Sequence, residues 1–169
     1  MFSGNLVGRR VPDATLGYME NGMLKTIEAE KVFSNEKVVT IGVPGAFTPI
    51  CTKEHVPDFI RNAERLKKSG FSKLVCIAAN DPFVLDVWAR QLDPDQKILF
   101  FADGNLSFTR SLGLASKLPD LLLGERSERF MMITQDGIIE HFRVEPNVLT
   151  FSCTRAEDAL KMKEVYELG

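Results

Sequence analysis

The chain has 169 residues, of which 44% are hydrophobic and 26% are charged, and its formal net charge is −2. This composition is typical of a globular protein, and we expect one domain spanning residues 1–169. The near-neutral charge gives no electrostatic reason to expect nucleic acid or membrane as a partner, and no apolar run approaches the roughly 20 residues of a membrane span. The N-terminus lacks the apolar core and cleavage site of a signal peptide, so we expect a cytoplasmic protein unless a presequence has been removed.

Strand-like and helix-like segments alternate along the chain. Glu20-Asn21-Gly22 and Gln135-Asp136-Gly137 separate short apolar runs and predict two β-hairpins. In chain order the expected elements are a hairpin (12–18 with 23–26), a helical turn (27–33), a strand (37–43), a helix (49–68), a strand (71–79), a helix (80–92), a strand (97–102), a short helix (106–112), a loop with one helical turn (113–128), a hairpin (130–134 with 138–144) and a helix (156–168) capped by Ser152 or Thr154.

This order predicts an α/β fold with right-handed crossovers and a central sheet covered on both faces. A βαβ unit followed by a closing ββα unit is the order of a thioredoxin-like fold. Here a β-hairpin is added at the N-terminus and an extra helix is inserted between the two units.

Cys51 lies where a predicted strand passes into a predicted helix. The β-branched run 37–41 precedes it, and Pro49 suits a first helical turn because it has a fixed φ and no N–H to satisfy. The unpaired N–H groups and the positive end of the helix dipole would then face the cysteine, and both favour a thiolate over a thiol. The sequence therefore predicts thiol chemistry at Cys51, although an inert cysteine at a helix start is the alternative.

The spacing Pro44-x-x-x-Thr48-x-x-Cys51 resembles the active-site motif of peroxiredoxins, thiol peroxidases with a thioredoxin-like fold. The wider sequence is similar to the type II, or peroxiredoxin-5, subfamily, and the similarity runs from about residue 12 to the last helix. The segments that carry it are 42–51, 55–59, 80–84, 101–104, 126–130 and 144–146.

The resemblance implies a role for four residues. Cys51 is the expected peroxidatic nucleophile, which attacks the peroxide O–O bond and becomes a sulfenic acid. Thr48 offers a hydroxyl that can donate to one peroxide oxygen and accept from the other, and Pro44 would shield the sulfenic acid from water. Arg129 matches the family's arginine and would place a fixed cation beside the sulfur.

The residues themselves leave alternatives open around this site. Thr48 can cap the helix, and Arg129 can form a surface salt bridge with Glu125 or Glu128, while Arg126 competes for its role. His55, four residues after Cys51, is interpreted as a packed and hydrogen-bonded histidine rather than a metal ligand, because no further cluster completes a metal site. The neighbouring Glu54 either orients Arg129 or is solvated.

How the sulfenic acid is reduced depends on two other cysteines. Cys76 lies in an apolar strand and is interpreted as a core residue, with a role as resolving cysteine as the alternative. Type II members from plants resemble the chain in having a cysteine there, and their reduction is linked to glutaredoxin. Cys153 matches the resolving cysteine of the animal peroxiredoxin-5 group, although Phe151-Ser152-Cys153-Thr154 replaces its glycine-rich approach. We expect direct attack by glutathione or glutaredoxin more than resolution by Cys153.

We therefore expect an antioxidant thiol-dependent peroxidase that reduces hydrogen peroxide and alkyl hydroperoxides without metal or other cofactor. Glutathione with glutaredoxin, or thioredoxin, would supply electrons, and the protein would form a homodimer. Phe47 and Phe83 are either core residues or part of its dimer surface. The alternative is a redox-sensing binding module that signals through oxidation of Cys51 without turnover. A thioredoxin-type disulfide reductase is disfavoured because no second cysteine follows Cys51 in a Cys-x-x-Cys pair.

Overall fold

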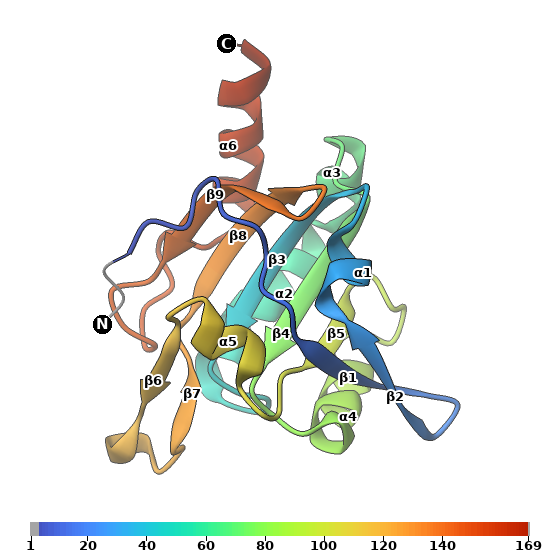
Figure 1. Ribbon diagram of the computed structural model, residues 1–169, viewed down its shortest axis with the longest axis vertical. Helices are drawn as coiled ribbons and strands as arrows, with labels where there is room; N and C mark the ends of the chain where they lie inside the picture. The colour runs from blue at the N-terminus through green and yellow to red at the C-terminus, as the bar shows by residue number, and fades with distance from the viewer. Residues whose placement is uncertain (1–3, 169) are drawn as a thin grey trace.

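A mixed seven-stranded sheet forms the centre of the protein, seen here in a computed structural model that describes residues 4–168 (Figure 1). The strands lie in the order β2-β1-β5-β4-β3-β8-β9; β3, β4 and β5 are parallel, and β8 joins β3 antiparallel. The bounds are β1 (Thr15–Glu20), β2 (Met23–Glu28), α1 (Ala29–Phe33), β3 (Lys37–Val43), β4 (Lys73–Ala78), α4 (Pro82–Leu92), β5 (Leu99–Ala102), α5 (Ser107–Ser111), β8 (Phe130–Gln135), β9 (Ile138–Val144) and α6 (Ala156–Leu168).

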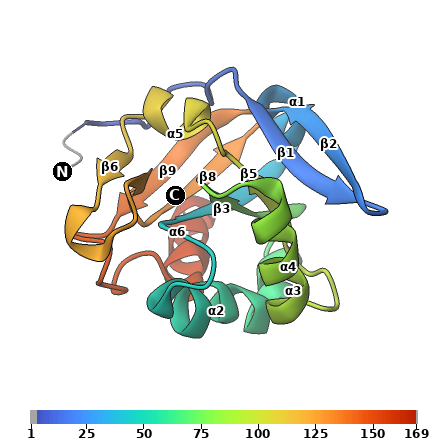
Figure 2. The same ribbon diagram turned by 90° about the horizontal axis from the view of Figure 1, so that it is seen from below.

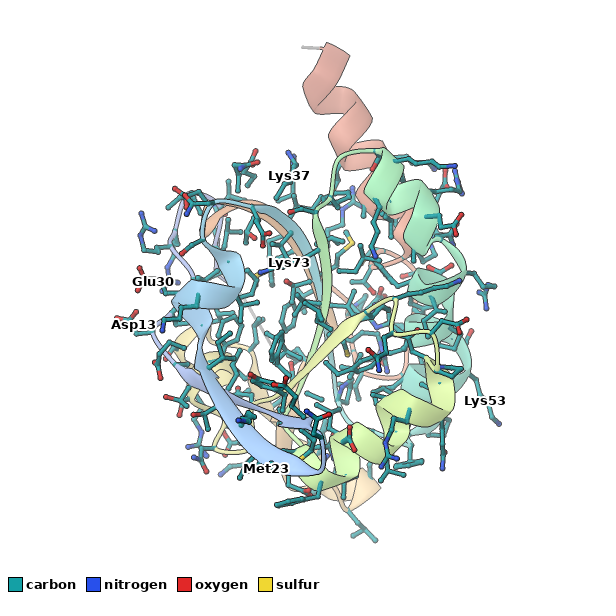
Figure 3. The ribbon with its side chains drawn as sticks, turned by 90° about the vertical axis from the view of Figure 1, so that its right-hand side faces the viewer. Asp13, Met23, Glu30, Lys37, Lys53 and Lys73 are labelled. Carbon is teal, nitrogen blue, oxygen red and sulfur yellow. The ribbon has the colours of Figure 1, made fainter. Side chains whose placement is uncertain are left out.

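Helices cover both faces of this sheet. Figure 2 shows α1 and α5 on one face and α2 (Val56–Arg61), α3 (Ala63–Lys68), α4 and α6 on the other. β3 with β4 and the helices between them forms the βαβ unit, and β8, β9 and α6 form the ββα unit. Hairpin β1–β2 precedes both units, with Met23 at its tip (Figure 3), so the predicted α/β, thioredoxin-like fold is confirmed. Among the described residues, no helix combines the length and apolarity needed to cross a bilayer.

β3 is buried on both faces, which explains its apolar composition. Val39 and Ile41 enter the core beneath α2 and α4, whereas Val38 enters the core beneath α1 and α5. Close to the end of the strand, a Cβ atom on Gly42 would overlap the Phe130 ring of β8. The absence of a side chain at Gly42 thus lets the strand that carries the candidate site pack directly against β8.

The helix predicted over 49–68 is interrupted. It starts at Pro49, passes through a π-helical turn η1 (Cys51–His55), and continues as α2 (Val56–Arg61) and α3 (Ala63–Lys68). In the π turn the Val56 N–H donates to the Cys51 carbonyl five residues back. Pro57 has no N–H for the Lys53 carbonyl, and its ring would collide with that group in a regular α-helix, so the turn widens.

Three further differences from the predicted elements have identifiable physical causes. Segment 113–128 is a small hairpin of β6 (Ala115–Lys117) and β7 (Glu125–Ser127) around a 3-10 turn η2 (Pro119–Leu121), where we predicted only a loop and one turn. Strands of three residues are too short for a periodic signal. The predicted cap of α6 was wrong: the Ser152 and Thr154 hydroxyls donate to Glu145, and an Asp58 carboxylate oxygen accepts from the Ala156 N–H at 2.7 Å. Asn62 divides α2 from α3 because its side-chain amide donates to the Asp58 carbonyl.

Candidate active site

Cys51 lies in the first turn of the helix that follows β3, and its side chain is fully buried. The first α-helical backbone bond runs from the Thr52 N–H to the Thr48 carbonyl at 3.0 Å. The Cys51 N–H therefore belongs to the groups that a helix start leaves for other acceptors. Lys53, two residues on, is exposed and points away from the protein body (Figure 3).

The active-site loop, residues 44–48 before the helix that carries Cys51, is held by the residue pair that follows a neighbouring strand. Asn80, between β4 and α4, accepts a hydrogen bond from the Ala46 N–H at 2.8 Å. Phe47 follows with φ of 64°, a left-handed conformation that costs a non-glycine residue on the order of 1 kcal/mol. A Cβ atom on Gly45 would lie 2.9 Å from Arg126 Nη1, so the loop packs closely against that side chain.

Arg129 is the cation beside the sulfur. Its side chain is buried, with 1% exposure, and Nη2 donates to Cys51 Sγ at 3.3 Å. The same nitrogen donates to the Val148 carbonyl at 2.9 Å. The alternative surface salt bridge with Glu125 or Glu128 is excluded because Arg129 is buried and none of the ion pairs among the described residues includes it. Arg126 is half-buried and donates from Nε to the Leu123 carbonyl at 3.0 Å, so Arg129 occupies the position for which the two arginines competed.

His55 anchors Arg129, a role the sequence did not indicate. Its Nε2 lies 3.0 Å from the Thr154 carbonyl, which can only accept, and its Nδ1 lies 3.1 Å from Arg129 Nη1, which can only donate. These partners require a neutral ring with the proton on Nε2. Burial, reinforced by the Arg129 charge, lowers the pKa of His55 to about 3, in agreement with that state. Glu54 is exposed and His55 takes the orienting position, so a role of Glu54 in orienting Arg129 is not supported.

A cavity of about 270 Å3 lies against Thr48 and Arg129, its two polar lining side chains. The lining residues are Pro44, Thr48, Pro49, Ile50, Leu121, Leu123, Arg129, Val148 and Leu149. Thr48 Oγ1 donates its proton to the Gly45 carbonyl at 2.7 Å. The Thr48 hydroxyl can therefore act toward a ligand in the cavity only as a hydrogen-bond acceptor. Cys51 does not itself line the cavity, and Arg129 connects the cavity to the sulfur. A larger cavity of about 370 Å3 between β1, α4 and β5 contains none of the predicted site residues.

The other two cysteines are free thiols in different environments. Cys76 lies in β4 opposite Ile41 and is fully buried; burial, with a smaller effect of Cys51, raises the pKa of its thiol. Cys153 is half-buried and precedes α6. Burial and the Glu145 carboxylate raise the pKa of Cys153 to about 11. Neither thiol is therefore prepared as a thiolate in this conformation.

Comparison with known proteins agrees with this geometry. The Redoxin family matches residues 6–160. Peroxiredoxin-2D of Arabidopsis thaliana is 40% identical over 156 residues, which cover 92% of this chain and 96% of that protein. Reduced Prx3 from Vibrio vulnificus, solved in complex with H2O2, superimposes with a TM-score of 0.89 at 33% identity over the full length of both chains. Peroxiredoxin 5 from Alvinella pompejana gives a TM-score of 0.84 at 30% identity, covering 94% of this chain and 97% of that one.

The family of the protein follows from two kinds of evidence. One is the contact between a buried arginine and the sulfur of a cysteine at a helix start, and the other is similarity to known proteins over nearly the whole chain. The protein is a thiol peroxidase of the redoxin family, a peroxiredoxin of the type II, or peroxiredoxin-5-like, group.

Proposed function

We propose that Cys51 is the peroxidatic cysteine and that Arg129, Thr48 and Pro44 form the site around it. The observation that carries this proposal is the contact of 3.3 Å between Arg129 Nη2 and Cys51 Sγ. A buried guanidinium at this distance stabilises negative charge on the sulfur and on a peroxide oxygen placed next to it. Pro44 lines the cavity without offering an N–H, which limits the approach of water to the oxidised sulfur.

The proposed reaction is a two-electron transfer. The Cys51 thiolate attacks the nearer peroxide oxygen, an S–O bond forms and the O–O bond breaks. The electron pair of the broken bond leaves with the second oxygen, which takes up a proton and departs as water or an alcohol. Thr48 accepts a hydrogen bond from the protonated peroxide oxygen, and Arg129 donates to the oxygen on which charge develops.

We propose hydrogen peroxide and small alkyl hydroperoxides as substrates. The cavity beside Arg129 has apolar walls of Ile50, Leu121, Leu123 and Leu149, which can bury an alkyl tail while the peroxide group meets Thr48 and Arg129.

We propose an external thiol as the reductant: glutathione with glutaredoxin, or alternatively thioredoxin. A thiol attacks the sulfenic acid, releases water and forms a mixed disulfide that a second thiol reduces. The burial of Cys76 and the raised pKa of Cys153 favour this route over an intramolecular disulfide. Mass spectrometry of the protein oxidised in the presence of glutathione tests it: one glutathione on Cys51 is expected, and a Cys51–Cys153 bond would refute the route.

The experiment that tests the whole proposal uses Cys51→Ser, with Cys76→Ser and Cys153→Ser as matched controls. Cys51→Ser should lose consumption of peroxide by thiol, whereas both controls should turn over many equivalents. Peroxide consumption by Cys51→Ser at the native rate would refute the assignment. A single turnover by the native protein would support the redox-sensing module instead.

We also propose a homodimer and a cytoplasmic location. Phe47 and Phe83 are 49% and 57% exposed, and Val84 and Val87, on α4 together with Phe83, are exposed as well. Asn80 joins this surface to the active-site loop, and an exposed apolar patch of this kind is typical of a protein interface. Phe83→Glu should convert a dimer to a monomer in analytical ultracentrifugation.

The proposed cytoplasmic location draws on the relatives at 40% identity, whose names carry no organelle. Imaging of the tagged protein tests the location.

A further inference from the structure

Glu145, directly after β9, is a buried carboxylate that the proposed reaction does not use. Its side chain is 2% exposed, and no salt bridge reaches it within the described part of the chain. Hydroxyl and backbone N–H groups of segment 150–154 surround it instead. The donors are Thr150 Oγ1 at 3.3 Å, Ser152 N at 2.9 Å and Oγ at 3.0 Å, Cys153 N at 2.8 Å, and Thr154 N at 2.9 Å and Oγ1 at 2.8 Å.

The bonds to Glu145 determine the shape of a segment that in turn holds the active site. Burial opposes ionisation of Glu145, but the hydrogen bonds from Cys153, Ser152 and Thr154 outweigh it and lower its pKa to about 2. The carboxylate is thus charged at neutral pH. It accepts hydrogen bonds from the N–H and hydroxyl groups of segment 150–154 and thereby fixes the conformation of that segment. A neutral amide at this position would present N–H groups to donors that need an acceptor.

A short chain of contacts connects this carboxylate to the sulfur. Thr154 binds Glu145 through its N–H and hydroxyl, while its carbonyl accepts from His55 Nε2. His55 Nδ1 accepts from Arg129, which donates to Cys51 Sγ. The second anchor of the guanidinium, the Val148 carbonyl, lies three residues after Glu145.

The backbone reinforces this connection. The Glu145 N–H donates to the Arg129 carbonyl at 2.9 Å. One anchor of the Arg129 side chain, the Val148 carbonyl, therefore lies on segment 145–154, and the other anchor, His55, is held by the Thr154 carbonyl of the same segment.

We propose that Glu145 is a positioning residue for the peroxidase reaction. It acts through segment 145–154 and His55 to hold the Arg129 guanidinium against Cys51. This proposal rests on the role assigned to Arg129 above.

The test compares Glu145→Gln with Glu140→Gln. Glu140, on the same β9, is a matched control because its carboxylate lies 3.7 Å from Lys37 Nζ, at the opposite end of β3 from the active-site loop. The rate of Cys51 oxidation by hydrogen peroxide in Glu145→Gln should fall by about 10- to 100-fold, because small displacements of a catalytic group are costly. Glu140→Gln should retain the native rate.

A second readout separates positioning from a merely structural role. The 15N shifts of the His55 ring report its tautomer and titration, and the chain has only one other histidine. In the native protein His55 should stay neutral with the proton on Nε2 down to pH 5. In Glu145→Gln it should lose that fixed tautomer, and its pKa should rise toward the ordinary 6.5 as its segment loosens.

The outcomes are decisive. A lower rate of Cys51 oxidation together with a His55 ring that has lost its fixed tautomer supports the proposal. A native rate in folded Glu145→Gln overturns it, and so does a lower rate with His55 still locked. If Glu145→Gln does not fold, Thr154→Val removes one donor from the carboxylate at nearly constant volume, and native values of both readouts there would overturn the proposal. Failure of the Arg129 assignment itself appears differently, as a native rate in Arg129→Gln.

Discussion

Replacement of Arg129 by glutamine removes the cation beside Cys51 while retaining a side chain that can donate hydrogen bonds. The guanidinium contacts the sulfur at 3.3 Å and is 1% exposed, so its charge acts with little screening by solvent. Loss of one preorganised donor to developing charge costs about 3 to 4 kcal/mol of transition-state stabilisation, or about 100- to 1,000-fold in rate. We expect a loss of that size in the second-order rate constant for hydrogen peroxide.

The assay is stopped-flow fluorescence during a single oxidation. The chain has one tryptophan, Trp88, which is buried and donates from Nε1 to Thr52 Oγ1 at 3.1 Å, next to Cys51. A change at the helix start should therefore alter its emission. Lysine at position 129 should recover only part of the rate, because a point charge cannot contact the sulfur, His55 and Val148 together.

Arg126→Gln is the matched control, because Arg126 lies against the active-site loop but donates to Leu123. It should retain most of the native rate. The role proposed for Arg129 is refuted if Arg129→Gln loses less than about tenfold in rate, or if Arg126→Gln loses as much as Arg129→Gln. Thermal unfolding of each variant verifies that the loss arises in folded protein.

Three other changes test separate parts of the structure. Since the pKa of His55 is lowered to about 3, the unfolded chain binds a proton at His55 below pH 6.5 that the folded chain does not. The free energy of unfolding should therefore fall as pH drops from 6.5 toward 3, by at most about 1.4 kcal/mol per pH unit from this group. Urea titrations of His55→Gln should show a weaker dependence of the unfolding free energy on pH. An unchanged pH dependence would contradict the buried neutral ring. Gly42→Ala should lower the free energy of unfolding by about 1 to 3 kcal/mol because its methyl group overlaps Phe130. Equal urea midpoints for the variant and the native protein would show that β8 can shift to accommodate the methyl group. Leu121→Gln should raise KM for an alkyl hydroperoxide but not for hydrogen peroxide, whereas Leu122→Gln, 93% exposed and outside the cavity, should change neither; equal effects on both peroxides would contradict an alkyl site there.

Much of the fold could be predicted because its signals are local. The β-branched run of β3, the turn residues of both hairpins and the Asp81–Pro82 start of α4 act within a few positions. The π turn at Cys51 could not be predicted from periodicity, because its cause is the missing N–H of Pro57 within an otherwise helical pattern. The β6–β7 hairpin also escaped prediction, since its strands have three residues each.

The site, like the fold, has a part that local sequence signals predict and a part that depends on tertiary contacts. Pro44, Thr48 and Cys51 lie within one strand end and helix start, so the sequence by itself determined that a cysteine lies in the first turn of a helix that follows a buried strand. The resemblance pointed to Arg129, but reasoning from the residues left Arg126 and surface ion pairs as alternatives. Only the tertiary structure decided between them, because the contact with Cys51 joins residues 78 positions apart.

The partners of Arg129 likewise depend on tertiary structure. The tautomer of His55 follows from a carbonyl 99 positions away, and the bonds of Glu145 follow from how segment 150–154 folds back on it. Local sequence determines which backbone geometry is favourable and therefore where Cys51, the proposed nucleophile, lies. The burial and hydrogen bonds that position a charge beside it arise only when distant segments pack together, which is why the cysteine was evident in the sequence and the network that holds its arginine was not.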